Sequence, residues 1–470
     1  MTAPPSESNL SRRNALKLGA AALGTAALAG CGAPGGEVSE TPSLPERTEG
    51  PGPRTERPRA EQYGTVTNVV DAGADPTGSE PIGSELQEHL NDDTLLSFPD
   101  GVYRLSNQTF RGLRNAALVA EPGARPVLTP ARPADEAGPY FLSFLDVREF
   151  VLDGLTFDFR QEGYGGRVQV IGSGDFVARN LTTVGRYPAD AIAFRFDVRN
   201  EAGTGLVENL VATSVPQTNE SVTGMYVGHQ HSGELTFRDC EVAGFSDNGL
   251  YASAPGGAGG AIPDAMDGPV HVRGGSYRNN NVAGVRLGST GSTARDVEIV
   301  VDRVPPHRND SVNARGLRLR GQQGQVVENC RITIGPEAGT GFGAIVFHRD
   351  SGQATVRNTT VRVDRDGVPA IYAIEPSSGP GGGPTFRNVD IRGSASGGAT
   401  ARLEGRNGTE FRNCSIRQRG SNRSGIELVD SRNCLVADTS IDVSGRPLVT
   451  TRSTVRKRNV SIDGGGSGLG

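Results

Sequence analysis

The feature that most constrains the fold is a short phrase that recurs along the chain. It reads FRDCEV at 237–242, VENCRI at 327–332, FRNCSI at 411–416 and SRNCLV at 431–436. Further copies place Asn or Asp in the third slot at intervals scattered around the high twenties. The slot holds Asn180, Asn209, Asp239, Asn279, Asp296, Asn329, Asn358, Asn388, Asn413, Asn433 and Asn459. Such a period, with no long helical pattern between copies, is typical of a solenoid.

The segments between these copies predict strands and not helices. Short alternating runs such as CRITI and TVRV are joined by turns rich in glycine, of which the chain has 66. We therefore expect an all-β right-handed parallel β-helix of about 13 coils, stacked at about 4.8 Å into a rod of roughly 60 Å. Asparagine tolerates left-handed backbone, and its amide can bond its copy in the next coil. The recurrent Asn is thus expected to form a ladder facing the interior.

Four of the five cysteines, Cys240, Cys330, Cys414 and Cys434, follow the ladder slot. Other copies hold Leu or Val there, so we expect these thiols to pack as small apolar fillers. No C-x-x-C spacing occurs, and no metal site is predicted. A disulfide between Cys414 and Cys434, one coil apart, is the alternative.

The N-terminal residues resemble an export signal. Arg12 and Arg13 precede an apolar stretch at 18–28, which predicts a twin-arginine signal and export by the Tat pathway. The letters LAGC at 28–31 resemble a lipobox, in which Cys31 receives a lipid; ordinary cleavage near Ala29 is the alternative. Since about 20 apolar residues are needed to span a bilayer, we expect a protein anchored on the outer face of the cell membrane through Cys31.

Composition and charge complete the domain plan. We expect a signal peptide at 1–30, a disordered tether rich in Pro, Glu and Gly at 31–62, the β-helix at 63–463 and a flexible tail at 464–470. The formal charge of −5 argues against a nucleic-acid partner, because such proteins usually carry a concentrated basic excess.

The segment at 69–105 resembles the N-terminal cap of the pectate lyase superfamily. It has a GA turn with an acidic Gly-rich loop, then a short helix with Ile82, Leu86 and Leu90 on one face, then the hairpin pattern FP-x-G-x-Y from Phe98 to Tyr103. The resemblance implies a β-helix whose open end is covered by that helix. It does not fix an activity, because the fold hosts lyases, hydrolases, epimerases and non-catalytic binders. The catalytic motifs of polygalacturonases and uronan epimerases are absent from the sequence.

Several predicted strands share the form Gly-apolar-x-apolar, and alternation turns the x residue outward. The outward column would hold Tyr226, Tyr251, Arg286, Arg318 with Arg320, His348, Tyr372 and Glu427. Aromatic faces suit sugar rings, and guanidinium groups suit carboxylates, so the column predicts a groove for an acidic polysaccharide. Tyr226, Arg320, Tyr372 and His231 are the expected substrate-binding residues, with the loop at 255–268 as one wall. A solvated sheet face is the alternative.

Three functions stay open. A polysaccharide lyase would use Arg286 and Arg318 to neutralise a uronate carboxylate, with Tyr251, His229 or His348 as the base. A glycoside hydrolase would need two carboxylates, for which Asp247 with Asp264 or Asp267 are the candidates. A glycan-binding or surface-scaffold protein would need neither. Calcium is a candidate cofactor of the lyase, but no calcium ligands can be assigned from the sequence.

Overall fold

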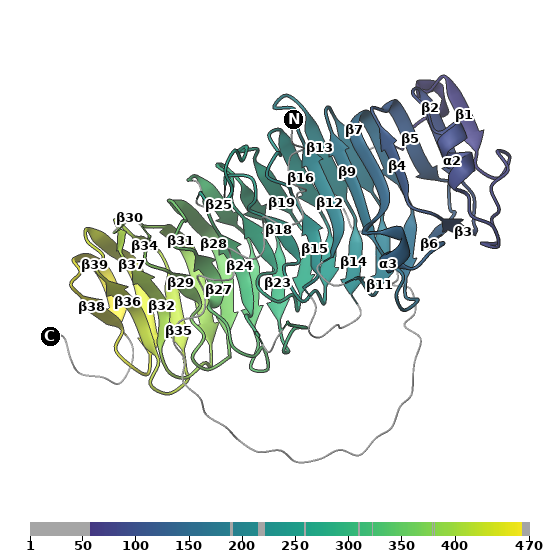
Figure 1. Cartoon of the computed structure of the whole chain (residues 1–470). Helices are drawn as coiled ribbons and strands as arrows, with labels where there is room; N and C mark the ends of the chain where they lie inside the picture. Colours follow the sequence, from purple (N-terminus) through teal and green to yellow (C-terminus); the bar gives the residue numbers. More distant parts are fainter. Residues whose placement is uncertain are drawn as a thin grey trace, which may run out of the picture.

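The computed structural model describes residues 57–462, apart from 189–190, 215–220, 258–259, 309–310, 322, 378 and 380. Strands dominate this part of the chain, and they pair in parallel from one coil to the next. They form one elongated stack, from the purple N-terminal end to the yellow C-terminal end (Figure 1). The predicted all-β parallel β-helix is confirmed. The export residues Arg12 and Arg13, and the lipidation residue Cys31, lie outside the described residues.

Helices are few and short. Within residues 57–462 they are η2 (Ala60–Gln62), α2 (Gly83–His89) and α3 (Ala134–Ala137). Helix α2 lies at the N-terminal end of the stack (Figure 1), and its neighbours Ile82 and Leu90, like Leu86 within it, are almost fully buried. The rings of Phe98 and Tyr103 meet edge to face with centroids 5.1 Å apart. The segment that resembles a pectate lyase cap therefore does form a helix at that end. Its predicted hairpin is wrong, because the strands at 94–98 and 102–105 pair in parallel with other coils and not with each other. No helix within the described ranges is long and apolar enough to cross a membrane.

Most coils contribute three strands, one to each of three faces. The first face, which we call the site face, is built from strands that pair only with one another. It consists of β4 (Gln108–Arg111), the first half of β7 (Tyr140–Asp153), β9 (Arg167–Gly172), β12 (Ile192–Val198), β15 (Thr223–Tyr226), β18 (Leu250–Ala252), β21 (Val285–Leu287), β24 (Arg315–Leu319), β27 (Gly343–Phe347), β29 (Ile371–Ala373), β32 (Ala399–Glu404), β36 (Ser424–Val429) and β38 (Leu448–Thr451).

The other two faces meet at a bend. The face before the bend comprises β1 (Thr65–Asn68), β2 (Thr94–Phe98), β5 (Arg114–Ala120), the end of β7, β10 (Phe176–Arg179), β13 (Thr204–Glu208), β16 (Glu234–Arg238), β19 (Val270–Arg273), β22 (Thr293–Arg295), β25 (Gln325–Glu328), β28 (Ala354–Val363), β31 (Thr385–Gly393), β34 (Glu410–Arg412), β37 (Cys434–Val443) and β39 (Val455–Ile462). The face after it comprises β3 (Val102–Leu105), β6 (Val127–Pro130), β8 (Thr156–Phe159), β11 (Thr182–Gly185), β14 (Val211–Ser214), β17 (Glu241–Ala243), β20 (Ser276–Arg278), β23 (Glu298–Val301), β26 (Arg331–Ile334), β35 (Ser415–Gln418) and the second halves of β28, β31, β37 and β39. A two-residue pair, β30 (Gly381–Gly382) with β33 (Arg406–Asn407), lies outside these faces.

The predicted ladder residues occupy the bend. Asn358, Asn388 and Asn413 stack in register, each with left-handed backbone. The amide of Asn388 donates to the side-chain oxygen of Asn358, and that of Asn413 donates to Asn388. The ladder faces outward, contrary to the prediction, since these side chains are exposed. The interior beside the bend is already filled by residues such as Phe386 and Val389.

Two residues do not belong to the ladder, because coil length varies. Register places Gly274, with φ +66°, in the slot predicted for Asn279, whose amide bonds Asp302 instead. Similarly, Asp438 and not Asn433 follows Asn413 in the ladder. A sequence phrase can therefore recur without recurring at the same place in the coil.

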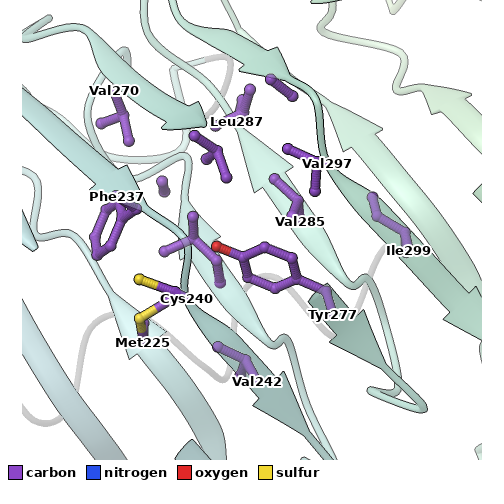
Figure 2. Close-up of a cluster of buried hydrophobic side chains, with 14 of the residues drawn as sticks. Met225, Phe237, Cys240, Val242, Val270, Tyr277, Val285, Leu287, Val297 and Ile299 are labelled. Carbon is purple, nitrogen blue, oxygen red and sulfur yellow. The ribbon is translucent and has the colours of Figure 1, made fainter. Parts of the chain in front are cut away.

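The cysteines pack in the core as free thiols. Cys240, Cys330, Cys414 and Cys434 are all buried and unpaired, so the packing prediction is confirmed and the Cys414–Cys434 disulfide is excluded. Figure 2 shows Cys240 beside Met225, among apolar side chains from neighbouring strands. The slip in register that removes Asn433 from the ladder also keeps Cys434 from stacking on Cys414.

Candidate functional site

The site face brings the central predicted residues into one column. Tyr226 pairs with Tyr251, Tyr251 with Arg286, and Arg286 with Arg318, each on the next coil. Their strand neighbours, such as Leu287, are fully buried in the core. Since alternate residues of a strand point to opposite faces, these four side chains lie on the outside of the coil.

The column continues with a difference from the prediction. Arg318 pairs with Val346, which pairs with Tyr372, and the column then runs through Arg402 to Glu427. His348 therefore does not occupy the column. It follows the end of β27, two residues beyond Val346, because Ile345 and Phe347 are the residues that fill the core.

Four arginines gather around the middle of this face, and we call Arg286, Arg315, Arg318 and Arg320 the arginine cluster. Arg286, Arg315 and Arg318 are only 6%, 6% and 8% exposed. Arg286 is held by two hydrogen bonds, from Nε to the Ser253 hydroxyl at 2.6 Å and from Nη2 to the Tyr251 hydroxyl at 2.9 Å. Its guanidinium also lies 3.8 Å from the centroid of the Tyr251 ring.

Arg315 and Arg318 have unmet hydrogen-bonding capacity. The Nε atom of each is buried without a partner within the described residues. Burial, and then the charge of Arg286, lowers the pKa of Arg315 to about 9. Burial, and then the charge of Arg315, also holds the pKa of Arg318 well below its ordinary value. The cluster is therefore short of negative charge.

One carboxylate lies in contact with the cluster. Asp350 accepts hydrogen bonds from Arg320, with Nη2 at 2.6 Å and Nε at 3.0 Å, and from Nδ1 of His348 at 2.7 Å. Burial acts to raise the pKa of Asp350, but the bonds from His348 and Arg320 outweigh it and lower that pKa. The residue is therefore an ionised carboxylate that holds two neighbours at once.

His348 is left with one nitrogen to use. Burial lowers its pKa to about 4, against the hydrogen bond with Asp350, which acts to raise it. The imidazole is therefore neutral at pH 7. Because the Asp350 carboxylate can only accept, Nδ1 carries the proton and Nε2 carries the lone pair. Nε2 has no hydrogen-bond partner in the described part of the chain.

An exposed ring borders the cluster on the C-terminal side. Phe342 is 43% exposed, and its ring lies 4.5 Å from the Arg315 guanidinium. It stacks against Tyr372 with centroids 6.2 Å apart and planes 9° apart. The Tyr372 hydroxyl donates to Glu404 at 3.1 Å. An aromatic surface therefore lies beside the arginine cluster on the next coil.

The other predicted histidines lie elsewhere. His231 is fully buried, and its Nδ1 accepts the backbone N–H of Val198 at 3.0 Å, so it supports the coil and cannot contact substrate. The predicted substrate-binding role of His231 is wrong. His229 is tied to the 255–268 loop through its carbonyl, which accepts the N–H of Met266 at 2.8 Å.

The predicted hydrolase carboxylates are engaged separately. Asp247 accepts hydrogen bonds from Ser221 at 3.2 Å and Asn248 at 2.5 Å. Asp267 accepts from the N–H and hydroxyl of Thr290 at 2.9 and 2.6 Å, on the exposed side of its loop. Nothing in these contacts points the two carboxylates at each other. No group of three or more His, Cys, Asp or Glu that could hold a metal ion occurs among the described residues.

The decisive residues that the sequence did not suggest are Arg315, Phe342, Asp350 and Ser253. Each lies at a strand end or in a loop, where period-two alternation gives no direction. One signal was available for Asp350: the letters HRD directly after the strand AIVF put a His and an Asp two residues apart at a strand end.

Comparisons with known proteins find one family profile and several solved structures that are similar to this chain. A family profile described as a right handed beta helix region matches residues 343–470. The catalytic unit of the GH87 α-1,3-glucanase from Streptomyces thermodiastaticus is 14% identical, with 86% of this chain and 69% of that one covered and a TM-score of 0.40. The A-module of the Azotobacter vinelandii mannuronan C-5 epimerase AlgE6 is 15% identical, with 84% and 98% covered and a TM-score of 0.42. PfbA, a surface protein and adhesin of Streptococcus pneumoniae, is 11% identical, with 85% and 98% covered and a TM-score of 0.46.

The sequence matches none of the curated proteins. The profile and the coil geometry agree on the fold over the C-terminal coils, and the same three-faced coil continues through the rest of the described chain. The described chain is a right-handed parallel β-helix.

Proposed function

We propose that the protein binds an anionic polysaccharide at the arginine cluster and cleaves it by β-elimination. The observation that carries this proposal is the excess of buried positive charge on the site face. Among the described residues, one carboxylate, Asp350, contacts the four arginines, and the buried Nε atoms of Arg315 and Arg318 have no partner there. An anionic group on the ligand would supply the missing acceptors.

The setting suits an anionic sugar better than a simple ion. Guanidinium groups bind carboxylates and sulfates through paired N–H donors. The rings of Tyr251 and Phe342 flank the cluster on neighbouring coils, and aromatic surfaces pack against sugar rings. Coils repeat about every 4.8 Å, so a polymer laid along the stack would meet this sequence of charge and ring in order.

The chemistry proposed is elimination next to a uronate carboxylate. Arg286 and Arg318 would neutralise that carboxylate, which makes the proton on the adjacent ring carbon easier to remove. Nε2 of His348 would take this proton. The electron pair then forms a carbon–carbon double bond as the bond to the glycosidic oxygen breaks, and the proton held on Nε2 of His348 would pass to the leaving oxygen. Binding of an anion beside His348 would raise the pKa of its imidazole toward the working range.

Hydrolysis is less well supported. It requires two carboxylates facing one bond, whereas Asp350 is occupied by Arg320 and His348, and Asp267 by Thr290. We also propose, from the N-terminal sequence alone, that the protein acts on the outer face of the membrane through a lipid on Cys31.

The test incubates the protein with uronate, sulfated and neutral polysaccharides. It follows unsaturated-uronate absorbance, new reducing ends and the heat of binding together. Elimination predicts that absorbance and reducing ends rise together on a uronate polymer, and that Arg318→Gln and His348→Gln abolish both. Arg417→Gln, which removes an exposed arginine from another face, is the control that should change nothing. Binding without either product would leave a non-catalytic glycan-binding protein, and no binding to any anionic polymer would refute the proposal.

A further inference from the structure

Another buried arginine, Arg406, contacts the backbone of the turn that follows β27. Arg406 is 1% exposed and starts the short strand β33. Its Nη1 donates to the carbonyl of Ser351 at 2.7 Å, and its Nη2 donates to the carbonyls of His348 and Ile374, both at 2.7 Å. Nε also reaches Ile374 at 3.2 Å. The side chain thus joins segments up to 58 residues away in the sequence.

Two of these carbonyls belong to the turn that carries Asp350. The N–H of Ser351 closes the turn on the carbonyl of His348 at 2.8 Å. Arg406 donates to both ends of the same turn, at His348 and at Ser351. The guanidinium of Arg406 therefore holds both ends of the backbone segment that carries the His348 imidazole and the Asp350 carboxylate. We call this set of hydrogen bonds the clamp.

Burying the charged guanidinium of Arg406 costs folding free energy, because the charge loses its hydration. The guanidinium of Arg406 is bonded to carbonyls and to no carboxylate, and burial lowers its pKa to about 10, against the charge of Asp350, which acts to raise it. Well-packed apolar residues are often at least as stabilising as buried charges. What the guanidinium adds is direction, because its fixed donors hold three carbonyls in one plane.

We propose that Arg406 is the positioning residue of the site: it fixes the 348–351 turn so that Asp350 reaches Arg320 and His348 together, and Nε2 of His348 faces the groove. The catalytic consequence rests on the function proposed above, but the geometric one does not. Without the clamp, the turn is free to move, and a displacement of about 1 Å is enough to reduce the rate about a hundredfold.

The chain supplies a matched control. Arg423 is also fully buried, and it donates to the carbonyls of Gly397 at 2.6 Å and Val368 at 2.7 Å. Its bond to Val368 spans 55 residues, as does the bond from Arg406 to Ser351. None of the residues it holds belongs to the arginine cluster or to the 348–351 turn. Arg406→Lys and Arg423→Lys thus remove the same fork from the same kind of environment.

The test has two readouts. Nitrogen-15 NMR of the histidine side chains reports whether His348 keeps the Nδ1–H tautomer bonded to Asp350, with His348→Gln used for assignment. Kinetics on the polysaccharide that the wild type cleaves reports kcat and KM. We expect Arg406→Lys to lose the His348 signature and at least about tenfold in kcat, with a smaller change in KM. We expect Arg423→Lys to keep both, although the two variants lose similar thermal stability.

An unchanged His348 signature in folded Arg406→Lys, or an equal loss in Arg423→Lys, would overturn the assignment. If Arg406→Lys does not fold, Arg406→Gln, which keeps one N–H donor group, is measured with Arg423→Gln under the same criteria. If the wild type cleaves nothing, the proposed function fails, and the NMR arm still decides whether Arg406 positions the turn.

Discussion

We expect Arg318 to lower the stability of the fold and to strengthen the binding of an anionic ligand. Arg318→Met should therefore raise stability and weaken binding. Two unit charges on neighbouring coils, about 4.8 Å apart, repel by roughly 3 kcal/mol at an effective dielectric constant of about 20. Arg318 pairs with Arg286 across such a step, is 8% exposed and leaves its Nε unbonded. Methionine fills a similar volume without charge or donors.

Replacing a poorly compensated buried charge by an apolar residue stabilises a protein by about 1 to 4 kcal/mol. At roughly 2.1 cal/mol/K per residue over about 400 residues, the thermal midpoint should rise by about 1 to 5 °C. A charged hydrogen bond to an anion is worth about 1.5 to 3 kcal/mol, so affinity for an anionic oligosaccharide should fall about 10- to 150-fold. Circular dichroism melts and titration calorimetry at low salt measure the two effects.

The control is Arg195→Met, on the same face. Arg195 is 2.7 Å from Asp197, whose side chain is fully buried, so its removal strands a carboxylate and should lower the midpoint. If Arg318→Met lowers the midpoint as Arg195→Met does, and affinity is unchanged, then Arg318 is not an uncompensated charge and the reasoning is wrong.

Four further outcomes follow from the same contacts. Asp350→Asn should reduce the elimination rate more than the affinity, because it frees Arg320 for the ligand while weakening the bond that fixes His348; steady-state kinetics separates kcat from KM. His348 has a pKa of about 4 in the folded state, below its unfolded value of about 6.5. Its contribution to the free energy of unfolding is therefore fully present above pH 6.5 and is lost as the pH falls toward 4, at about 1.4 kcal/mol per pH unit. The thermal midpoint of His348→Gln should depend less on pH across this window. Phe342→Ala should weaken oligosaccharide binding up to about tenfold with little change in the midpoint, as its ring is 43% exposed. Burial raises the pKa of the Cys414 thiol to about 11, so this cysteine should react with a thiol reagent only after denaturation.

The fold could be predicted because each coil of a β-helix repeats the same strand pattern and stacks in register on the previous coil. Period-two alternation identified the strands and turned Tyr251, Arg286 and Arg318 outward, and stacking in register then placed them side by side. The same reasoning failed for Asn279 and Asn433. The short repeated phrase does not show how long the preceding turn is. The ladder positions expected for Asn279 and Asn433 are therefore occupied by Gly274 and Asp438.

The site could be predicted only where it lies on strands. Asp350 follows β27 and reaches the cluster because the 348–351 turn folds back, which no alternation rule describes. Arg406 acts from another coil through backbone carbonyls, so its partners leave no trace in the sequence. His231 shows the converse error, since a histidine in a polar stretch became a core acceptor for one N–H group of the preceding coil.

The charge pattern along the stack explains why the middle coils stand out. Stacking in register places like side chains close together, so a column of arginines repels itself unless acids are interleaved. Several arginines on other coils of the described chain pair with an acid, as in Arg195–Asp197, Arg357–Glu328, Arg402–Glu427, Arg412–Glu410 and Arg452–Asp430. The arginine cluster departs from this pattern, since Asp350 is the one carboxylate of the described residues with a contact to it, and Arg320 makes that contact. Arg406 and Arg423 on other coils are also buried without a carboxylate partner in the described part of the chain, but each donates to backbone carbonyls. In the arginine cluster such side chains instead stack on neighbouring coils of the site face, and this arrangement is what supports the proposed binding of an anion there.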